Sequence, residues 1–312
     1  MAKHKARGGM VMWLLKKPYV WAAAYTLLLL AFTLCAVLDT FVIPRAYVIL
    51  DSETPQSDSE DSGGTSAGEA VTTENSYSDG NVAVTITKYR ENNTNIYVAD
   101  IRLSSADYLK TAFADNTYGK NVTEKTSVIA EAENAVLAIN GDFYGARNGY
   151  VIRNGTIYRD TAADSAQQDL VIYADGAFGI ITEGETTADE LLEGGAVQVL
   201  SFGPGLIADG EITVTNGEEV DKAMTSNPRT AIGIIDGLHY VMVVSDGRTS
   251  ESRGFTLTQL AEFMQGLGVT TAYNLDGGGS ATMYFNGAVV NNPTTDGKKI
   301  TERKVSDIVY IG

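Results

Sequence analysis

The chain has 312 residues, of which 44% are hydrophobic, and a formal net charge of −16 at pH 7. This length and composition suit one large globular domain with a sizeable core. Residues 51–312 carry 17 Lys and Arg (23 minus 6 in the first fifty) against 38 Asp and Glu (39 minus 1), a net charge of −21. Such an acidic surface argues against nucleic-acid or anionic-lipid binding by this part of the chain.

An uncharged stretch rich in Leu, Ala and aromatic residues runs from Tyr19 to Leu38. About 20 helical residues match the hydrocarbon core of a bilayer, so residues 19–43 are predicted to be a membrane anchor in contact with lipid. Five basic residues precede the stretch and place residues 1–18 in the cytoplasm as a basic tail: Lys3, Lys5, Arg7, Lys16 and Lys17. The protein is thus expected in the cell membrane, single-pass, with the bulk of the chain extracytoplasmic.

The alternative to an anchor is a cleaved signal peptide. The apolar run is longer than the usual 7–15 residues, and no small-x-small cleavage site follows it before Asp39. The only cysteine, Cys35, lies inside the run. The remainder of the chain therefore has no disulfide, no structural cysteine-zinc site and no thiol nucleophile.

Residues 44–80 are predicted to be an acidic stalk rich in Ser, Thr and Gly, because this composition buries too little apolar surface to fold. Residues 81–312 are predicted to form one domain. Its apolar segments are rich in Val, Ile, Thr and Tyr, which is typical of strands. They span residues 82–87, 96–103, 136–139, 170–173, 230–235, 238–244, 270–275, 283–285 and 305–311.

Two helices are predicted among these strands. The first covers residues 257–267, with apolar residues at i, i+3, i+4 and i+7, a capping box at Thr256 and Gln259, and Gly268 as its stop. The second covers residues 124–134, with Val128, Ile129 and Ala132 on one side. The expected fold is α+β (mixed α/β), with a mixed β-sheet core, flanking helices and one preceding transmembrane helix.

The turn signals then fix part of the topology. Asp236-Gly237 separates two apolar runs and predicts an antiparallel hairpin, which brings Arg229 beside residues 245–248. The strand, helix and strand over residues 238–275 have the length of a parallel crossover, so both strands should end at the same edge. Asp246, Arg248 and Asp276 should therefore meet Arg229 at one rim of the sheet, where open sheets with parallel strands bind ligands.

Three carboxylates, Asp142, Asp246 and Asp276, each stand in a glycine-bearing turn just after an apolar strand. A lone Asp-Gly pair is usually only a turn, but several that converge with arginines can divide acid and base roles around a bound phosphate. Asn140-Gly141-Asp142 reaches the same rim if its strand runs parallel. Gly277, Gly278 and Gly279 are expected to let a ligand approach the backbone, with amide N–H groups pointing at anionic oxygens. A hairpin rather than a helix follows them, at residues 283–290, which disfavours a nucleotide loop.

Histidine occurs only at His4 and His239. This disfavours a Ser-His-Asp triad, a His-based phosphodiesterase and a zinc hydrolase with histidine ligands. The sequence requires no cofactor and specifies no metal, although carboxylate and backbone oxygens leave Ca²⁺ possible.

Several motifs, in order, resemble the phosphodiester glycosidase domain family over about residues 120–312. They are residues 138–144 (AINGDFY), 201–206 (SFGPGL), 227–233 (NPRTAIG), 245–248 (SDGR), 274–280 (NLDGGGS) and 303–305 (RKV). That family includes the lysosomal enzyme that removes N-acetylglucosamine from a sugar phosphodiester, and bacterial proteins associated with exopolysaccharide. The sequence departs from the family pattern at two positions. Asp142 stands where another Gly is common, and Ala281 stands where a second Ser or Thr is common.

The resemblance implies hydrolysis of a sugar-1-phosphodiester at the anomeric C–O bond, in a phosphorylated glycan or envelope polymer. Asp276 would be base, nucleophile or oxocarbenium stabiliser, with Asp246 or Asp142 as its partner. The expected substrate-binding residues are Asn140, Arg229, Thr230, Arg248, Gly277, Gly278, Gly279 and Ser280. The alternative is a non-catalytic module that binds a phosphorylated wall polymer through the same arginines and Tyr144, Tyr150 or Tyr284. A purely structural envelope protein is a third hypothesis, which leaves the convergence at the rim unexplained.

Overall fold

A computed structural model describes residues 18–50, 70–163, 166–215 and 226–312. The predicted basic tail and most of the predicted stalk lie outside these residues. The chain divides into two compact units, residues 1–45 and 46–312. The first contains helix α2 (Pro18–Phe41), whose segment Tyr19–Phe41 is the one helix in the described residues that is long and apolar enough to cross a membrane. An anchor and a signal sequence share these properties.

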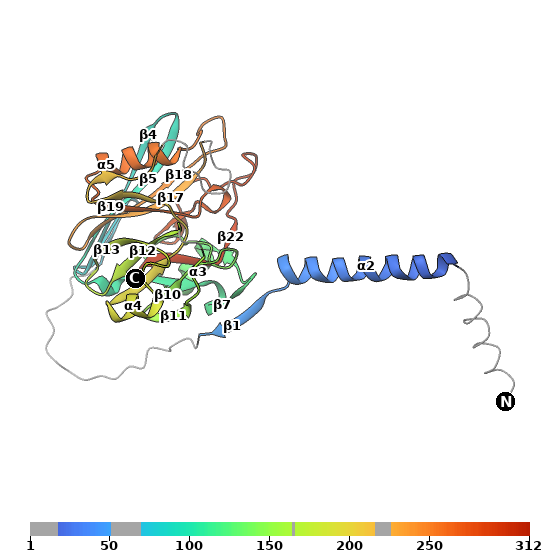
Figure 1. Ribbon diagram of the computed structural model, residues 1–312. Coiled ribbons are helices and arrows are strands. Elements are labelled where there is room, and N and C mark those ends of the chain that lie inside the picture. The colour runs from blue at the N-terminus through green and yellow to red at the C-terminus, as the bar shows by residue number, and fades with distance from the viewer. Residues whose placement is uncertain (1–17, 51–69, 164–165, 216–225) are drawn as a thin grey trace. The chain divides into compact units, whose positions relative to one another are not determined.

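The second unit is built on a nine-stranded sheet (Figure 1). In spatial order its strands are β16 (Glu211–Ile212), β15 (Gly205–Ala208), β19 (Thr271–Leu275), β17 (Arg229–Asp236), β18 (His239–Ser245), β5 (Thr94–Leu103), β4 (Val82–Glu91), β3 (Ser76–Ser78) and β2 (Val71–Thr72). β18 pairs antiparallel with β17 and with β5, and β17 pairs antiparallel with β19. Since β18 and β19 both flank β17, they run parallel to each other, as the predicted crossover requires.

Two five-stranded sheets complete the core. The first, here called the β9 sheet, has the order β21 (Ala288–Val289), β20 (Met283–Phe285), β9 (Leu137–Asn140), β23 (Asp307–Ile311) and β6 (Leu109–Phe113). The second, the β12 sheet, has the order β11 (Thr156–Arg159), β10 (Val151–Arg153), β14 (Ala196–Leu200), β12 (Gln168–Tyr173) and β13 (Phe178–Thr182). Two short ladders pair β1 (Arg45–Ile49) with β7 (Thr117–Lys120), and β8 (Glu124–Lys125) with β22 (Lys304–Val305).

Helices are few in the described part of this unit. They are α3 (Thr126–Ala132), α4 (Ala188–Glu193), α5 (Leu257–Gly266) and the 3₁₀ turns η1 (Ala106–Tyr108), η2 (Ala114–Asn116) and η3 (Gly278–Ser280). The capping box of α5 forms as predicted between Thr256 and Gln259. The face predicted for α3 is wrong, because Val128 is 44% exposed whereas Ile129 and Ala130 are buried. The helix is also shorter than predicted, and its buried residues are Thr126, Ile129 and Ala130.

The centre of the nine-stranded sheet, at β17, β18 and β19, is buried on both faces, which explains why residues 240–244 of β18 are apolar without interruption. Along β18, Met242 and Val244 face a core cluster shared with β9, β12 and β20. Val241 and Val243 face the other way, into a cluster that α5 covers. The sheet is thus the middle layer, and α5 lies along its outer face (Figure 1). These layers confirm the mixed α/β class expected from the sequence.

The predicted hairpin and its register are confirmed. Arg229 pairs with Ser245 across β17 and β18, and Thr230 pairs with Leu275 across β17 and β19. The start of β17 and the ends of β18 and β19 therefore lie at one rim. The condition set for Asn140-Gly141-Asp142, that its strand runs parallel, is not met, because β9 pairs antiparallel with β20 and β23 in a separate sheet.

The contact between α5 and β17 depends on a glycine, and it gives a test of the packing. A Cβ atom at Gly233 would lie 2.6 Å from Val269 Cγ1 and 3.0 Å from Met264 Cε. We expect Gly233→Ala to lower the free energy of unfolding by about 1–3 kcal/mol, since well-packed cores resist added methyl groups. Urea denaturation of the detergent-solubilised full chain measures this. Gly266→Ala is the control, because a Cβ there meets no atom within 4 Å; equal losses in both variants would contradict the packing.

Candidate active site

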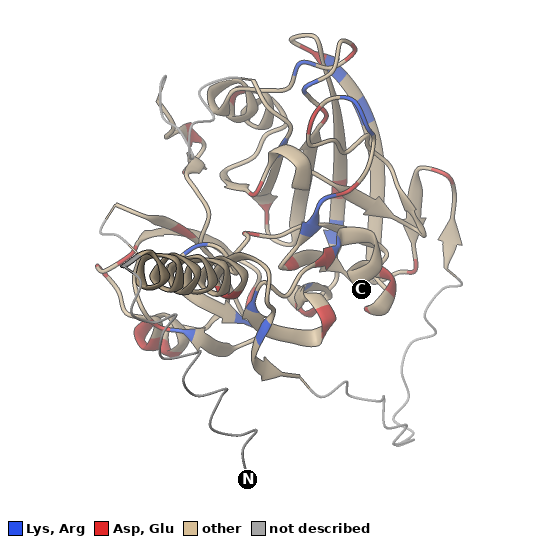
Figure 2. Cartoon of the chain, turned by 90° about the vertical axis from the view of Figure 1, so that its right-hand side faces the viewer, with Lys and Arg blue, Asp and Glu red and all other residues tan. Residues whose placement is uncertain are grey.

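A cavity of about 290 Å³ opens at the rim where β17 begins and where β18 and β19 end. Four arginines and one carboxylate line it together with aromatic, small and amide residues. The lining residues are Phe143, Ala146, Arg147, Phe202, Asn227, Arg229, Arg248, Asp276, Gly277, Gly278 and Arg303. Asp and Glu occur on many elements of the domain (Figure 2), so this gathering of cations stands out against an acidic protein.

Asp276 is the only carboxylate among the described residues of the lining, and it is 7% exposed. Its Oδ2 accepts a hydrogen bond from Arg303 Nη2 at 2.8 Å. Burial raises the pKa of the Asp276 carboxyl, while the charge of Arg303 and a hydrogen bond from Ser280 act in the opposite direction and lower it. Asp276 is thus a tuned carboxylate that faces a cavity, which is the usual environment of a catalytic acid or base.

Arg303 was not among the predicted site residues, although it begins the last motif of the family resemblance. It follows a loop and precedes β22, so neither strand ends nor glycine turns marked it in the sequence. Its Nε donates to Ser280 Oγ at 2.8 Å and its Nη2 also reaches the Gly277 carbonyl at 3.3 Å. Arg303 therefore holds the strand-end loop and its carboxylate in one arrangement.

Arg229 and Arg248 meet at the cavity as predicted from the hairpin. Arg229 is 4% exposed and its Nε donates to the Phe255 carbonyl at 3.0 Å. Arg248 is exposed, adopts φ of +63°, and donates to Asn227 Oδ1 and to the Thr295 carbonyl. Burial, followed by repulsion from Arg303, lowers the pKa of Arg248. Guanidinium groups that repel one another around one carboxylate leave an excess of positive charge for an anionic ligand.

The three glycines act mainly through packing. A Cβ at Gly277 would lie 2.7 Å from the Pro228 carbonyl oxygen, and one at Gly279 would lie 2.3 Å from Thr295 Oγ1. Gly278 adopts φ of +61°, and a Cβ there would lie 2.8 Å from Arg248 Nη2. The Gly278 N–H already donates to the Pro228 carbonyl at 2.9 Å. The expectation that this amide points at a ligand is therefore wrong; the glycines let arginines and neighbouring backbone close around the cavity.

Three other predicted binding residues lie behind the cavity. Asn140 is fully buried, and its Nδ2 donates to the Asp276 carbonyl at 2.6 Å. Its Oδ1 accepts from Thr230 Oγ1 at 2.8 Å and from the Thr282 N–H at 3.2 Å. Thr230 and Ser280 are buried as well. Asn140 thus connects the β9 sheet to the nine-stranded sheet and fixes the backbone of Asp276.

Asp246 and Asp142, the predicted partners of Asp276, do not line the cavity. Asp246 accepts hydrogen bonds from the Asn292 N–H at 2.8 Å, from Asn291 Nδ2 at 3.2 Å and from the Tyr97 hydroxyl at 3.3 Å. These donors turn its carboxylate toward the loop after β21. Of the three carboxylates predicted to meet at the rim, Asp276 alone lines the cavity.

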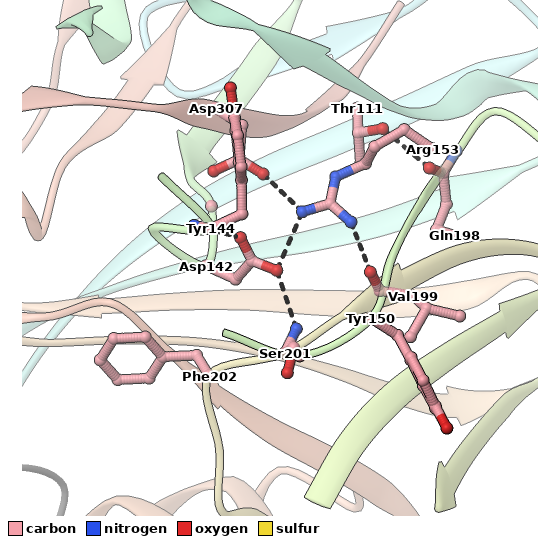
Figure 3. A network of polar contacts seen from close by, with 12 residues as sticks. Thr111, Asp142, Tyr144, Tyr150, Arg153, Gln198, Val199, Ser201, Phe202 and Asp307 are labelled. Atoms are coloured by element: carbon pink, nitrogen blue, oxygen red, sulfur yellow. Dashed lines mark hydrogen bonds and ion pairs between the residues drawn. The ribbon is translucent and has the colours of Figure 1, made fainter. Parts of the chain in front are cut away.

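Asp142 lies in a buried ion cluster (Figure 3). Its Oδ2 is 2.9 Å from Arg153 Nη2 and accepts the Ser201 N–H at 2.8 Å, while its Oδ1 accepts the Tyr144 N–H at 3.0 Å. Arg153 Nη2 is also 2.8 Å from Asp307 Oδ2. Each oxygen of Asp142 accepts a hydrogen bond from the protein and the side chain is fully buried, so this carboxylate does not face the cavity.

The remaining candidates are also in structural positions. Tyr144, Tyr150 and Tyr284 are 2%, 3% and 5% exposed, so none offers a ring face for a polymer. His239 pairs with Asp100 at 3.0 Å, at the far end of β18 from the cavity. Within the described ranges, no three His, Cys, Asp or Glu side chains are grouped to hold a metal ion.

Asp169 and Glu183 lie away from the cavity, and the pKa of Asp169 is perturbed. Both residues are almost fully buried, and Glu183 Oε1 accepts the Tyr150 N–H at 2.9 Å and Ser201 Oγ at 3.0 Å. Burial, reinforced by the charge of Glu183, raises the pKa of Asp169 to about 9. Asp169 is therefore protonated at neutral pH, beside the carboxyl group of Glu183.

This pair predicts a pH dependence of stability. The pKa of Asp169 is about 9 in the folded state and near its ordinary 3.8 in the unfolded chain. Its favourable contribution is complete below pH 3.8 and is lost as pH rises toward 9. We expect Asp169→Asn, which copies the neutral form, to raise the melting temperature relative to the wild type by a margin that grows between pH 5 and 9. Melting curves that stay parallel over this range would contradict the assignment.

Comparison with known proteins agrees with this geometry. Residues 133–312 match the family model described as phosphodiester glycosidase. Human N-acetylglucosamine-1-phosphodiester alpha-N-acetylglucosaminidase is 30% identical over 199 residues, which cover 58% of this chain and 38% of the human protein. The SPbeta prophage-derived uncharacterized protein YomE of Bacillus subtilis is 29% identical over 199 residues, covering 62% of this chain and 30% of YomE. The chain thus spans about a third of the length of these relatives.

Solved structures share the fold. The catalytic domain of the zebrafish N-acetylglucosamine-1-phosphodiester alpha-N-acetylglucosaminidase, auto-inhibited by its pro-peptide, aligns with a TM-score of 0.58 at 22% identity, covering 74% of this chain and 82% of that one. A hypothetical protein from Synechocystis aligns with a TM-score of 0.54 at 14% identity, covering 74% and 62%. Since the family model covers more than half of the sequence, the chain belongs to the phosphodiester glycosidase family.

Proposed function

We propose that this protein hydrolyses a sugar-1-phosphodiester at the anomeric C–O bond. The observation that carries the proposal is the cavity in which Asp276 is surrounded by Arg229, Arg248 and Arg303. Arginines bind phosphate oxygens through paired N–H groups, and a carboxylate beside them suits the positive charge that develops at an anomeric carbon. The family of the chain and the names of its enzymatic relatives support the same reaction.

In this reaction the arginines neutralise the phosphate as it leaves, and Asp276 acts in its ionised form. It either activates the attacking water, attacks the anomeric carbon itself or stabilises the oxocarbenium ion. Arg303 contacts Asp276 directly, so it keeps the carboxylate ionised while it contributes to the positive wall. Asn140 holds the Asp276 backbone and has a positioning role.

The helix α2 completes the proposal as a membrane anchor, with the enzyme domain on the extracytoplasmic side and a phosphorylated glycan or envelope polymer as substrate. The apolar length of Tyr19–Phe41 and the five preceding basic residues support this topology. Carbonate extraction of membranes and protease protection of an N-terminal tag would test it. A mature protein that begins after residue 43 and stays in the soluble fraction would contradict it.

The central test is turnover of sugar-1-phosphodiesters, with products identified by NMR. We expect Asp276→Asn to lower kcat/KM by about 10²–10⁴-fold, since a positioned carboxylate contributes this much. We expect Arg229→Ala to lower it by about 10²-fold or more, because it removes charge from the phosphate site. Near-normal turnover in both variants would refute the assignment. Binding of the phosphodiester without any release of product by the wild type would instead favour a non-catalytic binding module.

The matched control is Asp236→Asn, which makes the same chemical change at the opposite end of β17. Asp236 is exposed and opens the turn with Gly237. Asn-Gly forms this type of hairpin turn as well as Asp-Gly, so this variant should retain wild-type turnover.

The ion pair between Arg303 and Asp276 predicts a shift in the pH profile. Arg303 lowers the pKa of Asp276, against the larger raising effect of burial. Replacing it by Gln therefore raises the pKa further, and the ionised form persists only at higher pH. We expect the acid limb of kcat/KM in Arg303→Gln to move to higher pH, with a lower plateau. Lys304→Gln, which alters an exposed cation paired with Glu124 instead, should leave the acid limb in place.

A further inference from the structure

The cavity lining combines two kinds of side chain. Arg147, Arg229, Arg248 and Arg303 are cationic, whereas Phe143, Ala146 and Phe202 are apolar. Phe143 is partly exposed, and its ring centroid lies 5.8 Å from the Arg303 guanidinium carbon, so it borders the cationic residues. A sugar ring carries a face of C–H groups that packs on aromatic carbon, and pockets commonly combine such apolar walls with a few convergent polar groups.

We propose that Phe143 and Phe202 form the subsite for the sugar of the substrate, and that the buried cluster of Arg153, Asp142 and Asp307 is the device that positions it. The proposal rests on the proposed function, because it assigns the phosphate of the same substrate to Arg229, Arg248 and Arg303. It gives Asp142 and Arg153 positioning roles and gives Phe143 direct contact with the sugar.

The backbone of Phe143 supports this assignment. It adopts φ of +61°, a left-handed conformation that is uncommon for an aromatic residue and is found where the surroundings enforce it. The Phe143 side chain packs against the buried apolar core and also lines the cavity. A residue held this way at a ligand site indicates that the direction of the ring matters to function.

The neighbours of Phe143 in the sequence provide the enforcement. Before it, Asp142 is tied to Arg153 at 2.9 Å. After it, the Tyr144 N–H bonds back to Asp142 Oδ1 at 3.0 Å, and the Tyr144 ring stacks 5.1 Å from Tyr118. Both flanks of Phe143 are therefore fixed to groups that are themselves buried.

The same carboxylate also fixes the second ring. Asp142 Oδ2 accepts the N–H of Ser201, the residue before Phe202, at 2.8 Å (Figure 3). The Phe202 N–H then donates to the Tyr273 hydroxyl at 2.8 Å, and the Arg147 guanidinium lies 4.1 Å from the Phe202 ring centroid. Asp142 thus precedes Phe143 in the chain and binds Ser201, the residue that precedes Phe202.

Arg153 keeps Asp142 in place. It is 2% exposed, and its Nη2 lies between Asp142 Oδ2 and Asp307 Oδ2. Asp307 opens β23 and packs so closely on the backbone that a Cβ at Gly141 would lie 2.3 Å from its Oδ1. The cluster therefore links both five-stranded sheets to the loop that carries Phe143.

The first test compares ligand binding to the detergent-solubilised full chain by calorimetry. The probes are inorganic phosphate and a panel of hexose 1-phosphates that includes N-acetylglucosamine 1-phosphate. We expect at least one sugar phosphate to bind tenfold or more tightly than phosphate. Phe143→Leu should remove most of this preference while phosphate affinity stays within twofold. Phe178→Leu, on β13, is the control for the loss of a partly buried ring and should keep the full preference.

Two outcomes would overturn the subsite. One is equal affinity of the wild type for phosphate and for every sugar phosphate, and the other is a Phe143→Leu variant that retains the preference. Neither result depends on turnover. An inactive protein that still prefers a sugar phosphate through Phe143 would refute the hydrolase and keep the subsite.

The second test separates positioning from mere stability. Asp142→Asn retains one oxygen acceptor and the shape of the side chain. We expect it to fold with a lower melting temperature, to lose sugar preference about as far as Phe143→Leu does, and to raise KM more than it lowers kcat. The double variant should lose no more preference than either single variant, because both changes act on one contact. A lower melting temperature with an unchanged sugar-to-phosphate preference would reduce the cluster to a structural role.

If Asp142→Asn does not fold, Ser201→Pro offers a second route, because proline removes the N–H that Asp142 accepts, together with the hydroxyl that donates to Glu183. Ser201→Ala, which removes the hydroxyl alone, is its control. It should weaken sugar preference through Phe202 while leaving the ion pair of Asp142 and Arg153 intact. Retained preference in a folded Ser201→Pro protein would contradict the link between Asp142 and Phe202.

Discussion

A buried cation between two carboxylates constrains the arrangement of this fold. Arg153 comes from β10, Asp307 from β23 and Asp142 from the loop after β9, and all three are almost fully buried. Burial of a charged group costs several kcal/mol of folding free energy unless well-placed partners offset it. Loss of one partner from a buried ion pair typically lowers the free energy of unfolding by about 3–5 kcal/mol. The packing of the two five-stranded sheets therefore depends on the ion pairs of Arg153 with Asp142 and Asp307. The same ion pairs fix the loop between β9 and β10.

The cavity follows from the same junction. The Asp276 N–H donates to the Gly141 carbonyl at 3.2 Å, and Asn140 Nδ2 donates to the Asp276 carbonyl, so the end of β19 is fixed to the end of β9. The nine-stranded sheet supplies Arg229 and Arg248 at its rim, whereas the loop after β9 supplies Phe143 and Arg147 and the loop after β14 supplies Phe202. Cationic and apolar lining residues thus meet where the sheets pack together.

Local patterns predicted what local interactions decide. The Asp236-Gly237 turn fixed the register of β17 and β18, which was enough to bring Arg229, Arg248 and Asp276 to one rim. The direction of a carboxylate in an Asp-Gly turn is decided elsewhere. Asp142 turns inward because Arg153 lies there, and Asp246 turns toward Asn291 and Asn292, 45 and 46 residues further on. No sequence periodicity indicates such distant partners. For the same reason, strand ends and glycine turns did not predict that Arg303 and Phe143 belong to the site.

The presence of a single cavity carboxylate among the described residues is consistent with the proposed chemistry. Ordinary glycosidases use two carboxyl groups, because an alcohol leaves only when an acid protonates it. A phosphodiester leaves as a stabilised anion, so the protein needs charge neutralisation where other glycosidases need a proton. Arg229, Arg248 and Arg303 are placed to supply it in the proposed reaction. Burial, followed by repulsion from Arg303, lowers the pKa of Arg248, and a bound anion would relieve that repulsion. In the proposed reaction the same arginines would therefore attract the departing phosphate, and Asp276 would act on the sugar.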